Sequence, residues 1–290
     1  HKMKNIQQNL LSFLENENLS ENDIDEESLL KSITEDQSIF HDTIYLIAKI
    51  ANNHHRTPYF YDRILHILLK LKDRILQNFS KSKLYKIFKN NQRILLFLID
   101  QKMIEIDEYI ASKILNKVEN GQKYLMYFYP EIKPFVNITI VDKEILESMN
   151  IEKFNQYRKI GENDKYICHL IRNDLIKEFV IYVNQTNFKL NSRIETSFFE
   201  TNLFLREKSS VTLIEYASFF GSIQIFQYLR LNKIELDSSL WSFAIHGNNP
   251  EIIHLLEEDS IMPKDSNFIG CFIESIKCHH NNLASYFLNN

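Results

Sequence analysis

TLIEYASFFGSIQIFQYL, at Thr212–Leu229, aligns without a gap with SLWSFAIHGNNPEIIHLL, at Ser239–Leu256. The two segments are offset by 27 residues throughout, and their key matched positions are small, turn-forming or apolar. These matches are Ala217 with Ala244, Gly221 with Asn248, Ile225 with Ile252 and Leu229 with Leu256. Similarity at a fixed spacing is typical of a repeat architecture, in which each copy packs on its neighbour.

The first copy has the residues of a helix, a tight turn and a second antiparallel helix. Thr212 and Glu215 form a capping-box pattern that starts the first helix. Ala217 is small enough to let two helices approach closely, and Gly221 allows the backbone to reverse. Apolar residues then recur on one face of the second helix, at Ile225, Phe226 and Leu229.

The second copy predicts the same units with different turn residues. Asn248 occupies the turn, and Asn249 is a favourable N-cap. Pro250 follows at the first helical position, where its missing N–H is not needed. Trp241 aligns with Ile214, an apolar first-helix position, and is therefore expected in the core.

This pattern resembles the ankyrin repeat, T-P-L-H-x-A-A-x-x-G-H followed by an apolar second helix. Over roughly residues 160–290 the chain is similar, more narrowly, to the expanded ankyrin-repeat families of trichomonad protists that carry a domain of unknown function. Besides the two copies, the segments FVIYVNQTN, FETN and ESIKCHHNNLASYFL carry this similarity. The resemblance implies an ankyrin fold and a protein-interaction role, and it implies no known catalytic residue.

The chain departs from the ankyrin pattern in three ways. It has no Pro or His of T-P-L-H, it lacks the Gly-Ala-Asp-x-Asn finger, and its 27-residue spacing is shorter than the usual period of about 33 residues. The short spacing predicts that the hairpins between repeats, called fingers, are truncated. Recognition of a partner through these hairpins is therefore in doubt. We therefore expect the concave face of the first helices to carry recognition.

Two further helix pairs flank the clear copies, which makes at least four. The upstream pair takes its small, turn and apolar positions from Cys168, Arg172, Ile176 and Val180, and the downstream pair takes them from Ser275, His279, Leu283 and Phe287. Between the first two pairs, Asn184–Ser210 predicts an extended loop with a short helix near Ser197–Glu200. A weaker copy has Lys86, Asn90, Ile94 and Leu98 at these positions. Because Lys86 is not small, whether this segment is a true repeat stays open.

The rest of the chain reads as amphipathic helices at roughly 4–17, 25–34, 39–53, 60–77, 81–100 and 106–118. We predict an all-α fold: a helical solenoid of ankyrin-type helix pairs at 156–290, with an N-terminal helical region at 1–155 that caps or continues it. Only five Gly and five Pro among 290 residues disfavour a β-sandwich, which needs many tight turns.

Composition excludes several partner classes. A net charge of −4 gives no basic stripe for nucleic acid, and the densest basic stretch, Lys70–Arg93, is typical of the solvated side of successive helices. The longest apolar run, Ile94–Ile99, is too short for a membrane span. Three widely spaced cysteines, Cys168, Cys271 and Cys278, indicate reduced thiols and a cytoplasmic location.

Two groups of residues resemble metal ligands without matching a metal-site pattern. They are His54-His55 and the cluster of Cys271, Cys278, His279 and His280. Neither has the four-ligand spacing of a zinc site, so we expect no stoichiometric zinc and no cofactor. The chain has no phosphate-binding glycine loop and no hydrolase motif.

The repeat register predicts a partner-binding face. The two residues before the turn of an ankyrin first helix usually point into the concave groove. In successive copies they are Phe219 and Phe220, His246 and Gly247, and Lys277 and Cys278, of which Phe219, Phe220, His246 and Lys277 are the predicted partner-binding residues. Adjacent phenylalanines lie about 100° apart on a helix, so both cannot share one buried stripe. The alternative is that the N-terminal helices or the Asn184–Ser210 connection cover both rings.

These features predict a non-catalytic scaffold that binds a protein partner through the concave face of its solenoid. One alternative is an enzyme or regulatory subunit with its site in the N-terminal helices. Another is self-association through the repeat end at Leu283–Leu288. Neither the identity of the partner nor the oligomeric state follows from the sequence.

Overall fold

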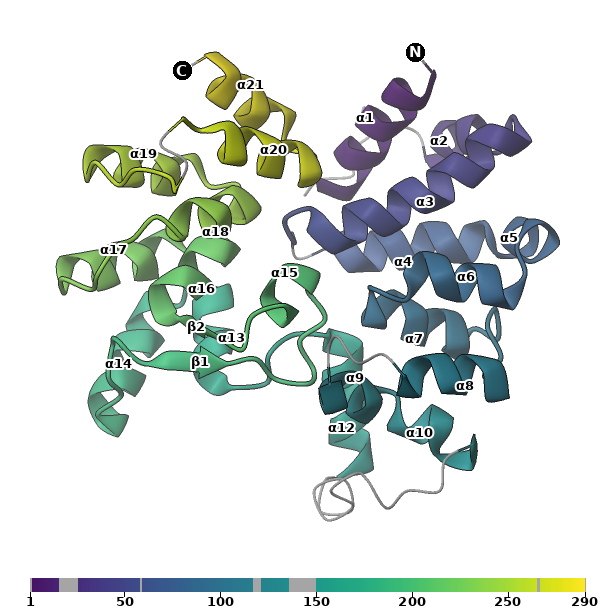
Figure 1. Cartoon of the computed structure of the whole chain (residues 1–290), viewed down its shortest axis with the longest axis horizontal. Coiled ribbons are helices and arrows are strands. Elements are labelled where there is room, and N and C mark those ends of the chain that lie inside the picture. The colour runs from purple at the N-terminus through teal and green to yellow at the C-terminus, as the bar shows by residue number, and fades with distance from the viewer. Residues whose placement is uncertain are drawn as a thin grey trace. The chain divides into compact units, whose positions relative to one another are not determined.

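The structure is a computed structural model that describes residues 2–15, 26–57, 59–116, 121–135, 150–264 and 267–289 (Figure 1). Helices make up most of these residues, which confirms the all-α prediction, and two three-residue strands are the only strands among them. Contacts divide the chain into two compact units, which are treated separately below. Unit 1 is His1–Asn52 with Arg56–Gly161, and unit 2 is Asn53–His55 with Glu162–Asn290.

The helices up to residue 115 overlap the six predicted ranges, and further helices follow them up to residue 160. They are α1 (Lys2–Glu15), α2 (Glu26–Thr34), α3 (Gln37–Asn53), α4 (Phe60–Lys70), α5 (Lys72–Asn78), α6 (Lys81–Phe88), α7 (Gln92–Asp100), α8 (Glu108–Leu115), α9 (Gly121–Tyr127), α10 (Tyr129–Ile132), the 3-10 turn η2 (Lys133–Phe135) and α12 (Ile151–Ile160). The predicted ends at residues 16–17, 25 and 117–118 lie outside the described residues.

Two long predicted helices are each divided in the structure. The helix expected at 60–77 breaks at Leu71, and the one expected at 81–100 breaks before Asn91. Asn91 begins α7 because its side chain accepts a hydrogen bond from the Ile94 N–H. The weak repeat predicted around residues 86–98 is therefore a helix pair in the structure, although its small position is still Lys86.

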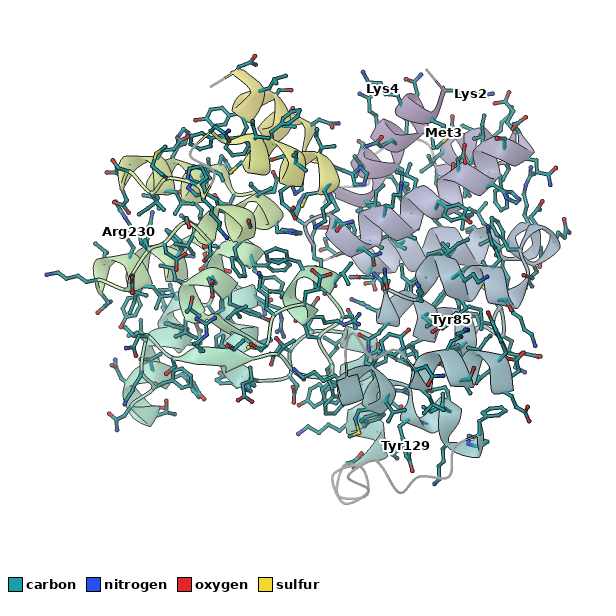
Figure 2. The ribbon with its side chains drawn as sticks, viewed as in Figure 1. Lys2, Met3, Lys4, Tyr85, Tyr129 and Arg230 are labelled. Atoms are coloured by element: carbon teal, nitrogen blue, oxygen red, sulfur yellow. The ribbon has the colours of Figure 1, made fainter. Side chains whose placement is uncertain are left out.

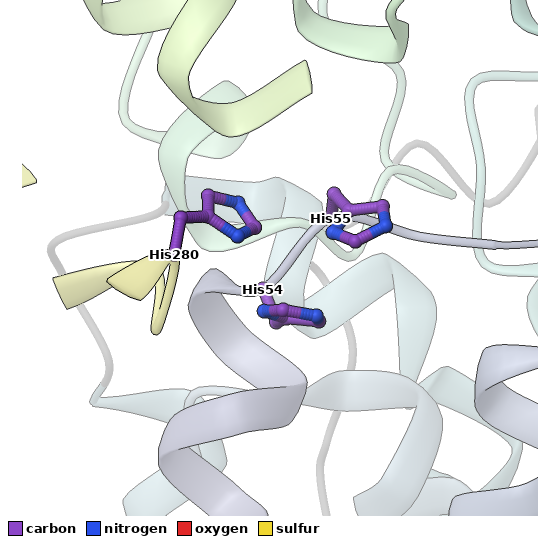
Figure 3. A group of neighbouring side chains, drawn as sticks. All are labelled: His54, His55 and His280. Carbon is purple, nitrogen blue, oxygen red and sulfur yellow. The ribbon is translucent and has the colours of Figure 1, made fainter. Parts of the chain in front are cut away.

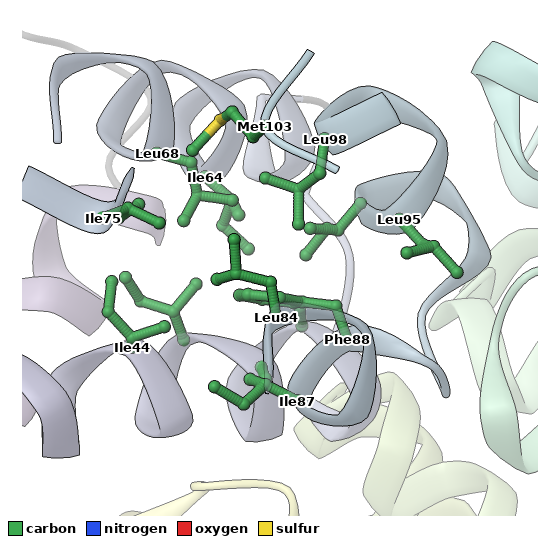
Figure 4. Packing of buried hydrophobic residues seen from close by; sticks show 14 of the residues in the cluster. Ile44, Ile64, Leu68, Ile75, Leu84, Ile87, Phe88, Leu95, Leu98 and Met103 are labelled. Atoms are coloured by element: carbon green, nitrogen blue, oxygen red, sulfur yellow. The ribbon is translucent and has the colours of Figure 1, made fainter. Parts of the chain in front are cut away.

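Apolar side chains from successive helices fill the core of unit 1 (Figure 4). The residues labelled there are Ile44, Ile64, Leu68, Ile75, Leu84, Ile87, Phe88, Leu95, Leu98 and Met103. Helix α12 joins this unit through the buried Arg158, whose guanidinium donates to both carboxylate oxygens of Glu131 at 2.7 and 3.0 Å. The domain boundary predicted near residue 155 lies inside α12.

Unit 2 contains the four predicted helix pairs. Its elements are α13 (Tyr166–Arg172), α14 (Ile176–Thr186), β1 (Arg193–Glu195), α15 (Leu203–Arg206), β2 (Ser210–Thr212), α16 (Leu213–Phe220), α17 (Ile223–Leu231), α18 (Leu240–Gly247), α19 (Pro250–Glu258), α20 (Ile269–Lys277) and α21 (Asn281–Asn289). The first helices pack in the row α13, α16, α18, α20, and the second helices α14, α17 and α19 form a row beside it (Figure 1).

The turn residues act as the sequence predicts. Thr212 and Glu215 form a complete capping box at the start of α16. Gly221 and Asn248 end the two first helices in the left-handed region, at φ 66° and 50°. Between the second helices, Arg230, which Figure 2 labels, donates to both carboxylate oxygens of Asp259 at 2.6 Å. Trp241 is buried, as expected.

The connection between the first two pairs differs from its prediction. Residues 197–200 form a turn and not a helix, and the short helix is α15, whose N-cap Asn202 accepts from the Leu205 N–H. On either side of α15, β1 pairs antiparallel with β2, with Arg193 opposite Thr212. This pairing draws the connection over the first helices. No helix among the described residues has both the length and the apolarity needed to cross a membrane.

Candidate functional site

Two of the four predicted partner-binding residues lie in the core of unit 2. Phe219 is 5% exposed and His246 is 1% exposed. The ring of Phe204, on α15, covers both, with its centroid 5.8 Å from that of Phe219 and 4.2 Å from that of His246. The structure thus corrects the prediction that these two side chains face an open groove, because the connection that carries α15 fills the space in front of them.

The other two predicted residues reach the surface. Phe220 is half-buried, and its ring contacts Tyr216 at 4.8 Å and Phe219 at 5.0 Å between centroids. Lys277 is exposed at the end of α20, and its ammonium lies 3.1 Å from a carboxylate oxygen of Glu274. Their part in partner binding stays a prediction.

Helix α20 carries an exposed apolar stripe that the repeat register did not single out. Ile269, Ile273 and Ile276 are 56%, 58% and 50% exposed. Their spacing of four and three residues places them on one side of the helix. Alignment to the turn selected Lys277 instead, because the register marks only the residues next to the turn.

A polar group joins α18 to α20. His246 lies 2.7 Å through its Nε2 from Glu274 Oε1, and 3.5 Å through its Nδ1 from the Cys278 Sγ. Burial lowers the pKa of His246, so the ring is neutral at pH 7. The carboxylate of Glu274 only accepts, so the Nε2–H of His246 donates to it. Every member of this Glu274–His246–Cys278 group therefore has a partner.

A carboxylate, an imidazole and a thiol in line suggest a nucleophilic triad, but the environment of Cys278 does not suit one. The thiol is fully buried, and burial raises its pKa above the ordinary value. A catalytic cysteine needs a lowered pKa and access for its substrate. We therefore interpret this group as a structural contact between two helices.

Three histidines form a second polar group in unit 2 (Figure 3). The ring centroids of His54, His55 and His280 lie 4.5, 4.7 and 5.1 Å from one another. One ligand nitrogen from each ring lies within 4.8 Å of the other two. No sequence motif signals this histidine group, because more than two hundred residues separate His55 from His280.

Burial determines the charge of His280. His280 is 5% exposed, and burial, followed by the neighbouring rings of His54 and His55, lowers its pKa to about 2. Its imidazole is therefore neutral at pH 7. Neutral imidazoles are the form of histidine that binds transition metals.

Unit 1 has an open polar depression of about 510 Å³. Its lining comes from α7 and α12: Arg93, Glu152, Asn155, Gln156, Lys159 and Ile160. None of these lining residues is a serine, threonine, cysteine or histidine, so the depression offers no nucleophile paired with a base.

Comparison with known proteins adds no relatives. No protein family, no curated protein and no solved structure matches the chain significantly. We therefore infer function from the helix pairs and from the side-chain groups described above.

Proposed function

We propose that this chain is a non-catalytic protein-interaction scaffold whose unit 2 is a degenerate ankyrin-type solenoid. The observation that carries the proposal is the row of first helices α13, α16, α18 and α20, each followed by a turn and a second helix. Stacked helix pairs of this kind present extended surfaces, and proteins built from them bind other proteins.

The surface that supports partner binding best is the exposed side of α20. Helix α18 packs against α20 on one side, and Ile269, Ile273 and Ile276 remain accessible. Burying an isoleucine side chain contributes roughly 1.5–3 kcal/mol. A stripe of three is therefore a strong anchor for a complementary face.

The partner that fits this stripe is a protein helix with its own apolar face. Such a helix would lie along α20 as α18 does, with apolar side chains at spacings of three and four residues. Lys277, beside Ile276, adds a positive charge at the rim, which favours an acidic residue on the partner. Among the residues first predicted for binding, Lys277 therefore retains a place in the proposed surface.

The test compares two isoleucine-to-glutamate variants. Ile273→Glu places a charge in the stripe, and Ile181→Glu makes the same change on α14 at a site of similar exposure, 54%. Cross-linking and mass spectrometry in cells that produce the protein should find a protein linked to Lys277, and Ile273→Glu should abolish that link while Ile181→Glu keeps it.

Light scattering identifies the partner when it is a second copy of the chain. In that case the mass rises with concentration for the wild type and for Ile181→Glu, and stays monomeric for Ile273→Glu. Links to Lys277 that survive in Ile273→Glu, or that are absent from the wild type, would refute the proposed surface. Circular dichroism checks that both variants fold.

A further inference from the structure

The histidine group brings together two parts of the chain that belong to unit 2. His54 and His55 follow the last residue of α3, and His280 comes directly before α21. The turn at His279, with φ 60°, directs the chain so that His280 faces the other two rings (Figure 3). Three imidazoles thus meet within unit 2.

The hydrogen bond of His54 orients one ring nitrogen toward a ligand role. His54 Nδ1 lies 2.7 Å from the carbonyl oxygen of Cys278. A carbonyl only accepts, so His54 donates its Nδ1–H, and in the neutral ring Nε2 carries the lone pair. Metal-binding histidines almost always donate their second ring nitrogen in this way, often to a backbone carbonyl.

His280 supplies an independent sign that a ligand is involved. Its Nε2 is buried and has no hydrogen-bond partner. Leaving a buried polar atom unsatisfied costs about 1–3 kcal/mol, so such an atom in a folded protein calls for an explanation. A bound cation would remove this cost, because it accepts the lone pair of a neutral imidazole.

The neighbouring Glu274–His246–Cys278 group serves as an internal contrast. It also has three metal-ligating side chains close together, but its members already bond to one another. A metal ion there would have to break those bonds. In the histidine group, by contrast, the buried Nε2 of His280 has no bond to lose.

We propose that His54, His55 and His280 bind one Zn²⁺ ion, with water as the fourth ligand. Imidazole nitrogens suit zinc, and three histidines with one open position are a known zinc arrangement. Calcium and magnesium require oxygen ligands, which this group lacks.

Only small side-chain movements are needed to bind the ion. Tetrahedral ligands at about 2.0–2.1 Å from zinc lie about 3.3 Å apart. The three ligand nitrogens already lie within 4.8 Å of one another, and the rings meet at angles of 47° to 50° without stacking flat. The ion would fix the segment Asn53–His55 to the turn between α20 and α21.

The first experiment titrates metal-free protein with zinc chloride by calorimetry and counts bound zinc by elemental analysis. We expect one zinc per chain, in place of the absence of zinc expected from ligand spacing along the sequence. His280→Gln and His55→Gln should each weaken binding by more than the 10- to 100-fold typical of losing an outer-shell partner. His254→Gln is the matched control, because His254 is an exposed histidine on α19, and it should bind zinc as the wild type does.

The second experiment uses the wild-type chain and therefore does not depend on any variant folding. Cobalt(II) replaces zinc, and its spectrum should show nitrogen and oxygen ligation, with hyperfine-shifted proton resonances from three imidazole rings. Thiolate-to-cobalt charge transfer would place the metal at Cys278 and overturn the proposal. A wild type that binds no zinc would also overturn it, as would folded His280→Gln and His55→Gln proteins that bind zinc normally.

Discussion

Helix α18 makes two contacts of different chemistry with its neighbours in the row of first helices. Toward α16 the contact at Gly247 is steric: a Cβ added there would lie 2.1 Å from the carbonyl oxygen of Ser218. Toward α20 the contact is polar, through His246, Glu274 and Cys278. Hydrogen bonds also link the α16 and α18 pairs, from Ser239 to Glu215 and from Asn249 to the Gly221 carbonyl, so the contrast lies between the backbone approach at Gly247 and the buried group of His246.

The difference teaches that successive pairs in one stack need not share one mechanism of stability. A steric contact has no titratable group, so its contribution does not change with pH. A contact through a buried histidine and a carboxylate depends on the protonation of both groups. Substitutions on the two sides of α18 should therefore differ in size and in pH dependence.

The largest effect is expected from Phe219→Ser, on the α16 side. The ring is buried between Phe204 and His246, and removing it leaves a cavity lined by their rings. Large-to-small changes of this kind cost about 3–5 kcal/mol. Urea unfolding measures the loss. Phe220→Ser, at a half-buried ring, should cost less than half as much, and equal losses would contradict the assignment of Phe219 to the core.

Gly247→Ala tests the steric contact itself and should cost about 3 kcal/mol, because the new methyl group meets backbone atoms that cannot rotate away. Helix propensity alone favours alanine by up to about 1 kcal/mol, so a net loss can come only from the contact. Ser242→Ala, on the same helix, is the control. An unchanged or raised melting temperature in Gly247→Ala would show that α16 and α18 separate easily.

The helix pairs could be predicted from sequence because their signals are local. The capping box at Thr212 and the turn at Asn248–Pro250 lie within a few residues of the structure they specify. The close approach at Gly247 could not be predicted in this way, because it depends on Ser218, in a different helix. The register did show Gly247 beside the turn, but it could not show which backbone faces it.

The parts of the site that the sequence missed depend on distant contacts. Helical phase gives the direction of Phe219, but only the β1–β2 pairing places Phe204 over it. The histidine group joins His54 and His55 to a residue near the other end of the chain, and ligand spacing along the sequence cannot detect it. The exposed isoleucines on α20 follow helical spacing, but the sequence does not show which side of that helix is buried.

Glu274→Gln should break the polar side of α18 and reveal its pH dependence. At pH 7 the loss of a hydrogen bond to a charged group should cost about 1.5 kcal/mol. Burial raises the pKa of Glu274, but the hydrogen bond to His246, aided by Lys277, outweighs burial and lowers it from 4.5 to about 2. The carboxylate therefore contributes fully above about pH 4.5, and its contribution disappears as the pH falls toward 2.

Urea unfolding at pH 7, 4 and 3 checks this window. The stability difference between the wild type and Glu274→Gln should shrink as the pH falls. Both proteins should also lose stability below about pH 6.5, because burial lowers the pKa of His246 and the unfolded chain takes up the proton first. A difference that stays constant from pH 7 to 3 would mean that Glu274 is not held as a carboxylate by His246.

The smallest effect is expected from Lys277→Ala, which separates the two partners of Glu274. Lys277 lies 3.1 Å from the same carboxylate oxygen as His246, but its side chain is 46% exposed. Exposed ion pairs contribute little because water and salt screen them, so the change should cost less than about 0.5 kcal/mol. Urea unfolding at low and high salt measures the stability that Lys277→Ala loses, and Glu274→Gln is measured in parallel for comparison. A cost as large as that of Glu274→Gln would mean that the surface pair, and not the buried His246, holds the carboxylate, and the polar contact between α18 and α20 would then be a surface feature.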